Sequence, residues 1–481
     1  MENVGNRVRQ RAQNVLRSDP SFRGSPRTIE TSPKEKGSSF WIKGKGRGGE
    51  TTRDKERGAK PAQQSIAKPS KRQIFPHDNT TTVVFRCSTR NIVYEVLKNR
   101  PGWVETTDDV DWDINWADVG WVRDMYEQMQ MDDDQHLNHF PNHYELTRKD
   151  LMVKNLKRMR KQLQRCDHHS EAASYCFWAE TFVLPSEYGM FVEEFKRSPG
   201  AVWIMKPIGK AQGRGIFLFN KLSQISEWKK DHRWKADQPQ AEAYIAQRYI
   251  EKPYLVGGKK FDLRLYVLVT SFSPLVVWLY RAGFARFSGT RYSRDGADMD
   301  MLHMHLTNVA IQKKADDYDK EVSCKWDLQS LKMLMIQRHG GQAVDELFYD
   351  IQCLITRSLL SVQKTIIQDR HCFELYGYDV IVDSNLRPWL LEVNASPSLS
   401  SENSSDRSLK TRLISDVLDV LNIERRPVQN EQSTVVGGFR LIWNNGYVDT
   451  KTAGGYTTYL GSEKAEVTAQ STADAPPEVA T

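Results

Sequence analysis

The chain has 481 residues, of which 27% are charged and 39% hydrophobic, and its formal net charge is +7. This length allows two or three lobes, while a mean hydropathy of −0.61 indicates that part of the chain stays outside a packed core. The most apolar run, residues 265–280, is interrupted by Ser271, Ser273 and Pro274, which predicts two adjoining strands and argues against a membrane span. The six cysteines show no CxxC or His-paired spacing, which argues against a zinc site and favours a reducing compartment.

Residues 1–75 form a basic arm. They contain 18 Lys and Arg against 7 Asp and Glu, a balance of +11, so the other 406 residues sum to −4. The arm is rich in Gly, Ser and Pro and has no apolar periodicity, which predicts disorder. Such a segment can be a solvated tail, or it can bind a polyanion such as nucleic acid or an acidic protein surface.

Ordered structure is expected from about Thr81, with a short strand in TTVVFRC and a helix at residues 92–98. The acidic segment that follows contains four tryptophans, Trp103, Trp112, Trp116 and Trp121. We interpret them as core anchors, because acidic neighbours disfavour a surface that stacks nucleic-acid bases.

A helical period spans residues 146–165, and most of its exposed positions are expected to be basic. These positions are Arg148, Lys149, Lys154, Lys157, Arg158, Arg160, Lys161 and Arg165. A basic helix face is usually a solvated surface, and it is also a candidate docking surface for an acidic partner.

Residues 201–219, AVWIMKPIGKAQGRGIFLF, predict a strand, a glycine-containing loop and a second strand. Lys206 ends the first strand and can place a charge on a phosphate, while Gly209, Gly213 and Gly215 let the backbone approach it. The loop lacks the GxxxxGK[ST] spacing and no helix is expected after it, so neither a P-loop nor a Rossmann fingerprint is supported. An ordinary glycine-rich hairpin is the alternative.

Polar residues flank further apolar strands. We expect residues 247–250 and 260–264 to precede two strands, and Thr307 and Asn308 to follow another. Polar groups at the ends of apolar strands are typical of a preformed ligand cleft.

Residues 376–393 predict a β-hairpin, because two alternating runs flank the turn residues at 383–386. A two-residue loop, Ser384-Asn385, would place position 379 opposite position 390, and position 377 opposite position 392.

In that register three polar side chains project from one face of the hairpin: Asp379, Glu392 and Asn394. The other face would carry an apolar set, namely Tyr378, Val380, Trp389, Leu391 and Val393. Two carboxylates and an amide oxygen are hard ligands that suit Mg²⁺, which usually also bridges to substrate phosphates. The alternative is a surface hairpin whose polar face is hydrated.

Residues 426–481 are expected to form a mostly disordered C-terminal tail. They contain one apolar patch, VVGGFRLIWNNGYV, and become polar from Ser462 onward.

Several of these motifs occur together in an order that resembles one known family. They are Lys206-Pro207, Gln212-Gly213, KFDLRLYVLVTS at 260–271, HLTN at 305–308, and YDVIVD followed by LLEVNASPS. In this combination the chain resembles the tubulin tyrosine ligase-like family over about residues 80–425. The segments HFPNHYELTRKDLMVKNLKR and CFELYGYDVIVD make it most similar to the short polyglutamylases of ciliated and flagellated cells, particularly the ninth member of the mammalian set.

The resemblance implies an α+β ATP-grasp fold in a catalytic domain at residues 76–425, with N-terminal, central and C-terminal lobes at about 76–150, 151–255 and 256–425. It implies a ligase that uses ATP and Mg²⁺ to add glutamate to the γ-carboxylate of glutamates in tubulin C-terminal tails, through an acyl phosphate. The implied partners are tubulin, free L-glutamate and an accessory protein, while membrane and nucleic acid are not expected. The implied location is the cytoplasm and cytoskeleton, in the axoneme and basal body of a cilium or flagellum.

The resemblance also implies roles for individual residues. The ATP site would comprise Lys206, Gln212, Gly213, Gln247, Arg248, Tyr249, Ile250, Lys260, Phe261, Asp262, Thr307 and Asn308. Mg²⁺ would be held by Asp379, Glu392 and Asn394, with Glu392 and Arg264 as catalytic residues and Arg264 near the transferred phosphate. Gln212 would also contact the acceptor peptide, and the free amino acid would be bound by Arg286, Lys325 and Lys410. A glutamate carries two carboxylates, so this cationic set fits it better than glycine or tyrosine.

The chain departs from some relatives at two positions. Ala395 stands where several have a His that contacts the acceptor, and Val309 stands where some have Tyr. Acceptor choice, and whether side chains are started or lengthened, are therefore left open. A tubulin glycylase, another carboxylate–amine ligase of the same fold, and a catalytically silent microtubule-binding scaffold are the alternatives. The intact charged set at Lys206, Asp379 and Glu392 argues against the scaffold, because clustered like charges repel each other.

Overall fold

The computed structural model describes residues 82–210, 212–225, 243–313, 324–427, 433–448 and 458–462. The predicted basic arm at residues 1–75 and the end of the predicted C-terminal tail, from residue 463, lie outside these described residues. Within the described ranges, no helix is both long and apolar enough to cross a membrane.

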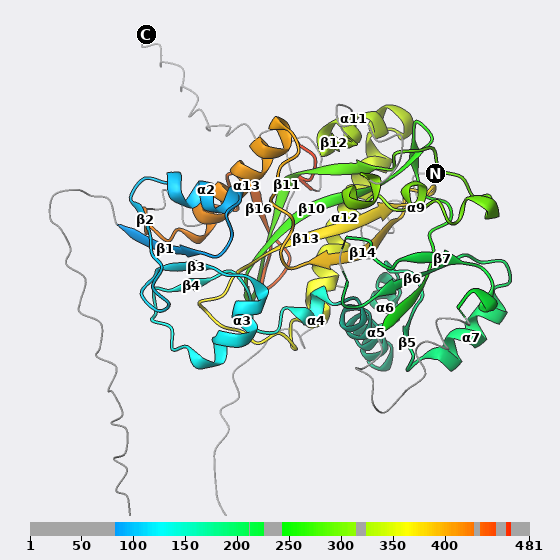
Figure 1. The fold of residues 1–481 in the computed structure, drawn as a ribbon, viewed down its shortest axis with the longest axis horizontal. Helices are drawn as coiled ribbons and strands as arrows, with labels where there is room; N and C mark the ends of the chain where they lie inside the picture. Colours follow the sequence, from blue (N-terminus) through cyan, green and yellow to red (C-terminus); the bar gives the residue numbers. More distant parts are fainter. Residues whose placement is uncertain are drawn as a thin grey trace, which may run out of the picture. The chain divides into compact units, whose positions relative to one another are not determined.

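A small parallel sheet with the strand order β2-β1-β3-β4 begins the described chain (Figure 1). Its strands are β1 (Val83–Cys87), β2 (Trp103–Glu105), β3 (Ile114–Trp116) and β4 (His136–Leu137). The helices of this part are α2 (Ile92–Asn99), α3 (Val119–Met125), the 3-10 helix η2 (Tyr126–Gln128) and α4 (Tyr144–Thr147). The predicted strand and helix at its start are confirmed, and Trp103, Trp112 and Trp116 are buried as predicted, whereas Trp121 is only partly buried.

A second, antiparallel sheet has the order β5-β8-β6-β7. Its strands are β5 (Thr181–Leu184), β6 (Trp203–Pro207), β7 (Phe217–Phe219) and β8 (Tyr244–Arg248). The helices around it are α5 (Lys149–Arg165), α6 (His169–Ser174), α7 (Tyr188–Arg197) and the 3-10 helix η3 (Leu222–Ile225). β6 and β7 pair directly, which confirms the strand, glycine-containing loop and strand predicted at residues 201–219.

The large sheet has the order β14-β13-β10-β11-β16-β15, with β9 on β10 and β12 on β11. Its strands are β9 (Leu255–Val256), β10 (Lys259–Phe272), β11 (Leu275–Phe287), β12 (Lys325–Asp327), β13 (Glu374–Val382), β14 (Pro388–Asn394), β15 (Val435–Val436) and β16 (Phe439–Asn444). The helices are the 3-10 helix η4 (Gly296–Asp298), α9 (Leu302–His305), α10 (Val309–Gln312), α11 (Leu328–His339), α12 (Gly341–Val362) and α13 (Ser404–Leu421). The two adjoining strands predicted at residues 265–280 are therefore confirmed as β10 and β11.

Alternation along β10 decides what each face of the large sheet carries. Leu263, Leu265 and Val267 point to one face and pack in the same core as α12. Tyr266 and Leu268 point to the other face and pack with α13. Successive side chains in a strand point to opposite faces, so the polar residues earlier in β10 at positions 260, 262 and 264 share the α13 face.

The fold continues beyond the predicted domain boundary at residue 425. β16 pairs with β11 in the large sheet, and Leu460 is fully buried in the main core. The described residues 433–448 and 458–462 thus belong to the folded domain, so part of the range expected as a mostly disordered tail, residues 426–481, packs beyond the predicted boundary. The part that joins the large sheet is the apolar patch VVGGFRLIWNNGYV, which supplies β15 and β16 to it.

Candidate active site

The predicted hairpin exists as β13 and β14, but its register differs from the prediction. Asp379 lies opposite Glu392, and Gly377 lies opposite Asn394, whereas the sequence analysis paired position 379 with 390. Two local features cause the shift. The loop has three residues between the paired Asp383 and Arg387, and Leu386 within it has a φ of 60°. A bulge also interrupts the pairing between Asp379 and Val380.

The bulge preserves the common face of the three predicted metal ligands. Asp379, Glu392 and Asn394 all line one pocket. The three-residue loop, which shifts the pairing before the bulge is reached, puts Trp389 and Leu391 on the pocket wall, so their predicted place on the packed face is wrong. Leu390 packs in the core instead, with Tyr378, Val380 and Val393, which were predicted correctly.

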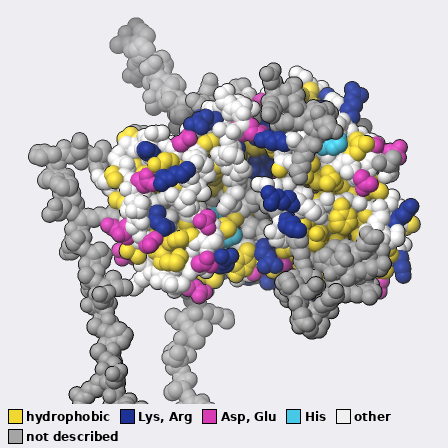
Figure 2. All heavy atoms as spheres, viewed as in Figure 1, with side chains coloured by type: hydrophobic (Ala, Val, Ile, Leu, Met, Phe, Trp, Pro, Cys, Tyr) yellow, Lys and Arg dark blue, Asp and Glu magenta, His cyan; other side chains and the backbone are white. Residues whose placement is uncertain are grey.

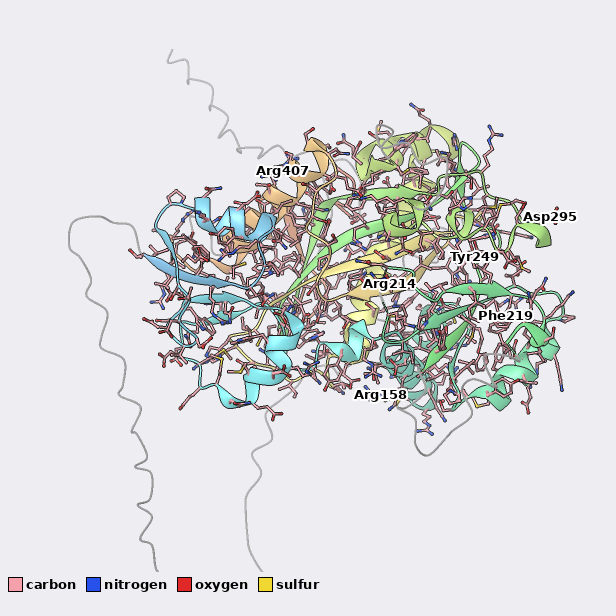
Figure 3. All side chains as sticks on the ribbon, in the orientation of Figure 1. Arg158, Arg214, Phe219, Tyr249, Asp295 and Arg407 are labelled. Carbon is pink, nitrogen blue, oxygen red and sulfur yellow. The ribbon has the colours of Figure 1, made fainter. Side chains whose placement is uncertain are left out.

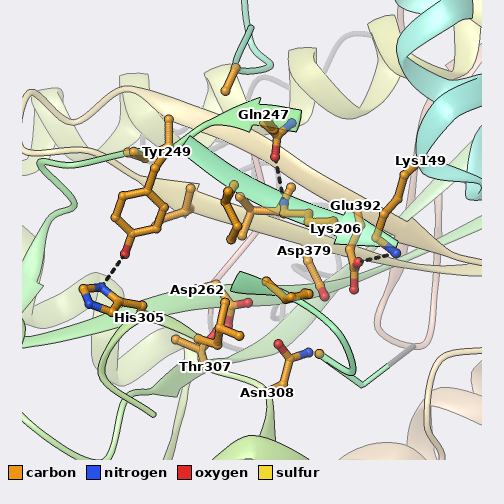
Figure 4. Close-up of a pocket in the computed structure, with 18 of the residues that line it drawn as sticks. Lys149, Lys206, Gln247, Tyr249, Asp262, His305, Thr307, Asn308, Asp379 and Glu392 are labelled. Carbon is orange, nitrogen blue, oxygen red and sulfur yellow. Dashed lines mark hydrogen bonds and ion pairs between the residues drawn. The ribbon is translucent and has the colours of Figure 1, made fainter. Parts of the chain in front are cut away.

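This pocket lies between the antiparallel sheet that contains β6 and β8 and the face of the large sheet that carries β14 (Figure 4). It gathers most of the residues expected at an ATP and metal site. Those that line it are Lys206, Gln212, Gly213, Gln247, Arg248, Tyr249, Ile250, Lys260, Asp262, Thr307, Asn308, Asp379, Glu392 and Asn394. Residues that lie as far apart in the sequence as 206 and 394 thus line one pocket, which agrees with the predicted ligand cleft.

Two buried lysines supply positive charge to the pocket. Lys206 Nζ donates to Gln247 Oε1 at 2.7 Å, and Lys260 Nζ donates to the Tyr249 hydroxyl at 2.8 Å and to the His305 carbonyl at 2.7 Å. Burial lowers the pKa of Lys206 to about 8, against the opposing effect of Glu392. Burial likewise lowers the pKa of Lys260 to about 7, although nearby Asp262 raises it. A polyanion that enters the pocket therefore favours the protonated, cationic form of both lysines.

Asp379 is held by two arginines. Arg264 Nε donates to its Oδ1 at 2.6 Å, and an Arg286 nitrogen lies 2.8 Å from its Oδ2. Arg286 also forms an ion pair with Asp262 at 2.5 Å, so two arginines and two aspartates form one compact network. Burial alone would raise the pKa of Asp379, but Arg264 and Arg286 outweigh it and hold that pKa far below its usual range. Asp379 is therefore an anion at any physiological pH.

The other two predicted metal ligands lie on β14, and both have contacts that leave ligand atoms for a cation. Asn394 Nδ2 donates to the Gly377 carbonyl at 3.2 Å, which fixes the amide and leaves its oxygen as the ligand atom. Glu392 pairs with Lys149 through one carboxylate oxygen at 3.2 Å. Two carboxylates and an oriented amide suit Mg²⁺. Among the described residues no group of three His, Cys, Asp or Glu side chains could hold a metal, and the predicted set differs by using an amide as its third member.

The cations expected to bind the amino acid lie next to this pocket, on the α13 side. Arg286 of β11 is the direct cross-strand partner of Lys325 of β12. Lys325 and Lys410 both pair with Asp406, each at 3.0 Å, and Lys325 also pairs with Glu402 at 2.8 Å. Asp406 and Lys410 are one helical turn apart on α13, so the first turns of this helix provide both the carboxylate that pairs with the two lysines and one of those lysines.

Three details of the sequence analysis need correction. Phe261, expected in the ATP site, points to the opposite face of β10 and packs in the main core, 1% exposed. Residues 247–250 and 260–264 do not precede strands, because β8 and β10 include most of them. Thr307 and Asn308 follow the short helix α9, not a strand.

Lys149 was missed as a pocket residue because it was assigned to the exposed basic face. It lines the pocket and contacts Glu392 (Figure 4). A signal was present: Lys149 precedes the buried Met152, Val153 and Leu156 by three, four and seven residues, which places it on the buried face of α5. Most of the rest of that basic face is surface: Arg158, for example, is exposed, lies at the lower edge of the folded part in Figure 3, and does not line the pocket.

The glycine loop closes one side of the pocket. Gln212 and Gly213 have φ values of 61° and 76°, both left-handed. A Cβ on Gly213 would lie 2.9 Å from the Ile311 side chain, so only glycine fits against α10. On the face shown in Figure 2, Lys and Arg side chains gather near the middle, in the region where Figure 1 places β14. This part of the surface suits an acidic ligand.

Comparisons with known proteins agree with the resemblance. Residues 127–433 match the model of the tubulin-tyrosine ligase family. The chain is 48% identical over 399 residues to the probable tubulin polyglutamylase TTLL9 of Rattus norvegicus, and the aligned region covers 77% of this chain and 86% of the relative. It is 47% identical over 366 residues to the probable tubulin polyglutamylase ttll-9 of Caenorhabditis elegans, covering 76% of this chain and 85% of the relative. It is 44% identical over 371 residues to the probable alpha-tubulin polyglutamylase Ttll1 of Tetrahymena thermophila, covering 71% of this chain and 88% of the relative.

These matches confirm the family and the likeness to its ninth mammalian member, and the mixed α/β content of the three sheets agrees with them. All residues that line the pocket, in which buried lysines meet an aspartate, a glutamate and an asparagine, lie within the matched region. The chain belongs to the tubulin-tyrosine ligase family.

Proposed function

We propose that the chain is an ATP- and Mg²⁺-dependent ligase that adds glutamate to the γ-carboxylate of glutamates in tubulin C-terminal tails, and thus a tubulin polyglutamylase. One observation carries the proposal: the buried Lys206 and Lys260 line the same pocket as Asp379, Glu392 and Asn394. Phosphoryl transfer from ATP needs cations that hold the phosphates and oxygen ligands that hold Mg²⁺. The names of the rat, nematode and Tetrahymena relatives support polyglutamylation of tubulin.

The proposal includes an ATP-grasp fold with lobes at about residues 76–150, 151–255 and 256–425. ATP would bind between the sheet of β6 and β8 and the large sheet, since both line the pocket. Lys206 and Lys260 would contact its phosphates, and residues 247–250 would border the adenine.

Asp379, Glu392 and Asn394 fit Mg²⁺, which when bound would offset charge on the transferring phosphoryl group. Arg264 would lie beside that group, because it already contacts Asp379. Its guanidinium can shift from the aspartate to a phosphate oxygen without leaving the site, since both are anionic acceptors. The arginine would thereby stabilise charge where it develops.

The chemistry proceeds in two balanced steps. A carboxylate oxygen of the acceptor glutamate bonds to the γ-phosphorus of ATP, ADP leaves, and an acyl phosphate results. The amine of free glutamate then attacks the carbonyl carbon, phosphate leaves, the amide forms and the nitrogen releases its extra proton. Activation is required because a carboxylate is a poor electrophile. Arg286, Lys325 and Lys410 would hold the two carboxylates of the incoming glutamate, and Gln212 would contact the acceptor.

Several parts of the proposal concern the cell. We propose tubulin and free L-glutamate as substrates, with an accessory protein as a further partner and no role for membrane or nucleic acid. We propose the cytoplasm and cytoskeleton, in the axoneme and basal body of cilia or flagella, as the location. The basic arm at residues 1–75 has a charge suited to the acidic microtubule surface.

The test supplies microtubules, ATP and Mg²⁺ to the full chain, with labelled glutamate, glycine or tyrosine in parallel reactions. ATP-dependent incorporation of glutamate alone is the expected result. Incorporation of glycine would identify a glycylase. If none of the three amino acids is incorporated while the protein still binds microtubules, the scaffold is favoured. Addition of a ciliary extract to an inactive sample distinguishes the scaffold from an enzyme that lacks its accessory protein.

A further inference from the structure

A buried carboxylate outside the pocket has a full set of donors. Glu374, at the start of β13, is 0% exposed. Its oxygens accept from His139 Nδ1 at 2.9 Å, the Phe140 backbone N–H at 3.2 Å and the Tyr376 hydroxyl at 3.1 Å. A buried carboxylate is costly without partners, and this one joins β13 to the segment at residues 139–140. The mechanism above uses none of these groups.

The second nitrogen of His139 faces the loop that follows β14. Nδ1 of His139 donates to the carboxylate of Glu374, and Nε2 is the other hydrogen-bonding atom of the ring. The hydroxyl of Ser396 lies 3.4 Å from that Nε2, within hydrogen-bond distance. Ser396 is two residues after Asn394, so the chain Glu374, His139 and Ser396 ends beside a predicted metal ligand.

The same loop is fixed on its other side by Gly377. A Cβ on Gly377 would lie 2.8 Å from Cβ of Pro397, so glycine is needed for the loop to pack there. The Gly377 carbonyl also accepts from the Asn394 amide at 3.2 Å. Residues 395–398 are therefore held between β13 and His139.

The position of β14 explains why such support is useful. β14 is an edge strand of the large sheet, so β13 supports it on one side only. The segment from His139 to Lys149 contacts the loop after β14 through Ser396, and the metal-ligating end of β14 itself through the 3.2 Å pair between Lys149 and Glu392. Ligands that must be held to within a fraction of an ångström need supporting contacts of this kind.

We propose that His139 is a positioning residue: oriented by Glu374, it fixes the loop at residues 395–398 through Ser396 and so holds Asn394 in place for Mg²⁺. The inference rests on the proposed function for the identity of the metal site. His139 contacts no substrate and acts only through the loop.

The test removes the contact between His139 and Ser396 by substituting each partner in turn. Ser396→Ala removes the hydroxyl, and His139→Asn keeps an amide donor for Glu374 at the place of Nδ1 while removing Nε2. Tyr376→Phe is the matched control, because it removes a different hydrogen bond to the same carboxylate and leaves the contact between His139 and Ser396 intact. The readouts are Mn²⁺ binding in the presence of a non-hydrolysable ATP analogue, followed by electron paramagnetic resonance, and the steady-state constants for glutamate incorporation.

Ser396→Ala and His139→Asn should each weaken Mn²⁺ binding by about 3- to 10-fold, below the range of about 10- to 100-fold typical of supporting residues because the contact is long. The double variant should be no weaker than either single variant, since both remove the same contact. Tyr376→Phe should lower the melting temperature and leave Mn²⁺ binding within about 2-fold.

Mn²⁺ binding unchanged in Ser396→Ala, multiplicative losses in the double variant, or an equal loss in Tyr376→Phe would each overturn the positioning role. These results are independent of the amino acid that is transferred. A wild-type protein that binds Mn²⁺ with the ATP analogue but incorporates no glutamate, even after addition of a ciliary extract, would overturn the proposed function alone.

Discussion

Binding of ATP should weaken steeply as the pH rises from 7 to 9, because the two lysines expected to hold its phosphates have lowered pKa values. A cationic lysine binds a phosphate, and Lys206 loses its proton as the pH passes about 8. The protonated fraction of a group with that pKa falls from about ten in eleven at pH 7 to about one in eleven at pH 9, a factor of about 10. A solvent-exposed lysine with a pKa of about 10.4 would remain almost fully protonated over this range.

Lys260 adds to the effect at lower pH, since its pKa is about 7. The sign follows from burial: the pocket disfavours the charged form of each lysine, so protonation is completed only at lower pH or when a polyanion enters. The dissociation constant of a non-hydrolysable MgATP analogue should therefore rise by at least about 10-fold from pH 7 to pH 9.

The assay is isothermal titration calorimetry at pH 6.5 to 9 in buffers of different ionisation enthalpy, which also counts the protons taken up. Lys206→Arg serves as the comparison, because arginine stays charged over this pH range. Protonation of the nucleotide itself affects both proteins equally, so it does not contribute to the difference between them. Its pH dependence should be reduced to the part that belongs to Lys260. A flat dissociation constant up to pH 9 in the wild type, with no proton uptake, would refute the reasoning.

Three further outcomes are expected. Gly213→Ala should lower catalytic efficiency by at least about 10-fold, because its φ of 76° and an added Cβ 2.9 Å from Ile311 force the loop to move. Gly209→Ala is the control: no atom lies near its added Cβ, so catalytic efficiency should change by less than about 2-fold. Asp406→Asn should raise the KM for glutamate and leave the KM for ATP unchanged, since it removes the carboxylate that positions both lysines of the amino-acid site, Lys325 and Lys410; an equal rise in both constants would argue against that site. Leu460→Ala should lower stability to denaturant by about 2–4 kcal/mol, as for a core leucine, and an unchanged midpoint would show that residues 458–462 are not part of the folded core.

The alternation of residues predicted the three metal ligands of this site because a strand has only two faces, whereas most of the other site residues were implied by the family resemblance. The pattern KFDLRLYVLV places the polar positions of β10 on one face and the apolar positions on the other, which the structure confirms. The same rule, applied strictly, would have removed Phe261 from the expected ATP site. Asp379, Glu392 and Asn394 line one pocket as predicted, but they share that face because the bulge compensates for the longer loop, which simple alternation does not describe.

Details that depend on one extra residue could not be obtained from the pattern. The three-residue loop with Leu386 at positive φ shifts the hairpin by one position, and the bulge after Asp379 shifts it again. Neither is encoded by a glycine or an asparagine at the place where it occurs, so no local signal marked them. The contacts of Glu374 with His139 join positions 235 residues apart, and only the folded chain brings them together.

The most direct test of the central claim compares wild-type protein with Glu392→Gln in ATP-dependent transfer of labelled glutamate to microtubules, with modified tails identified by mass spectrometry. Glu392 is half-buried at the pocket, and replacing its carboxylate by an amide removes a ligand charge while keeping the side-chain shape. The account predicts glutamate branches on tubulin tails with the wild type and a loss of at least about 100-fold with a folded Glu392→Gln protein. Equal transfer by both proteins would contradict it, because a ligase whose metal is held by Asp379, Glu392 and Asn394 cannot lose this carboxylate without consequence.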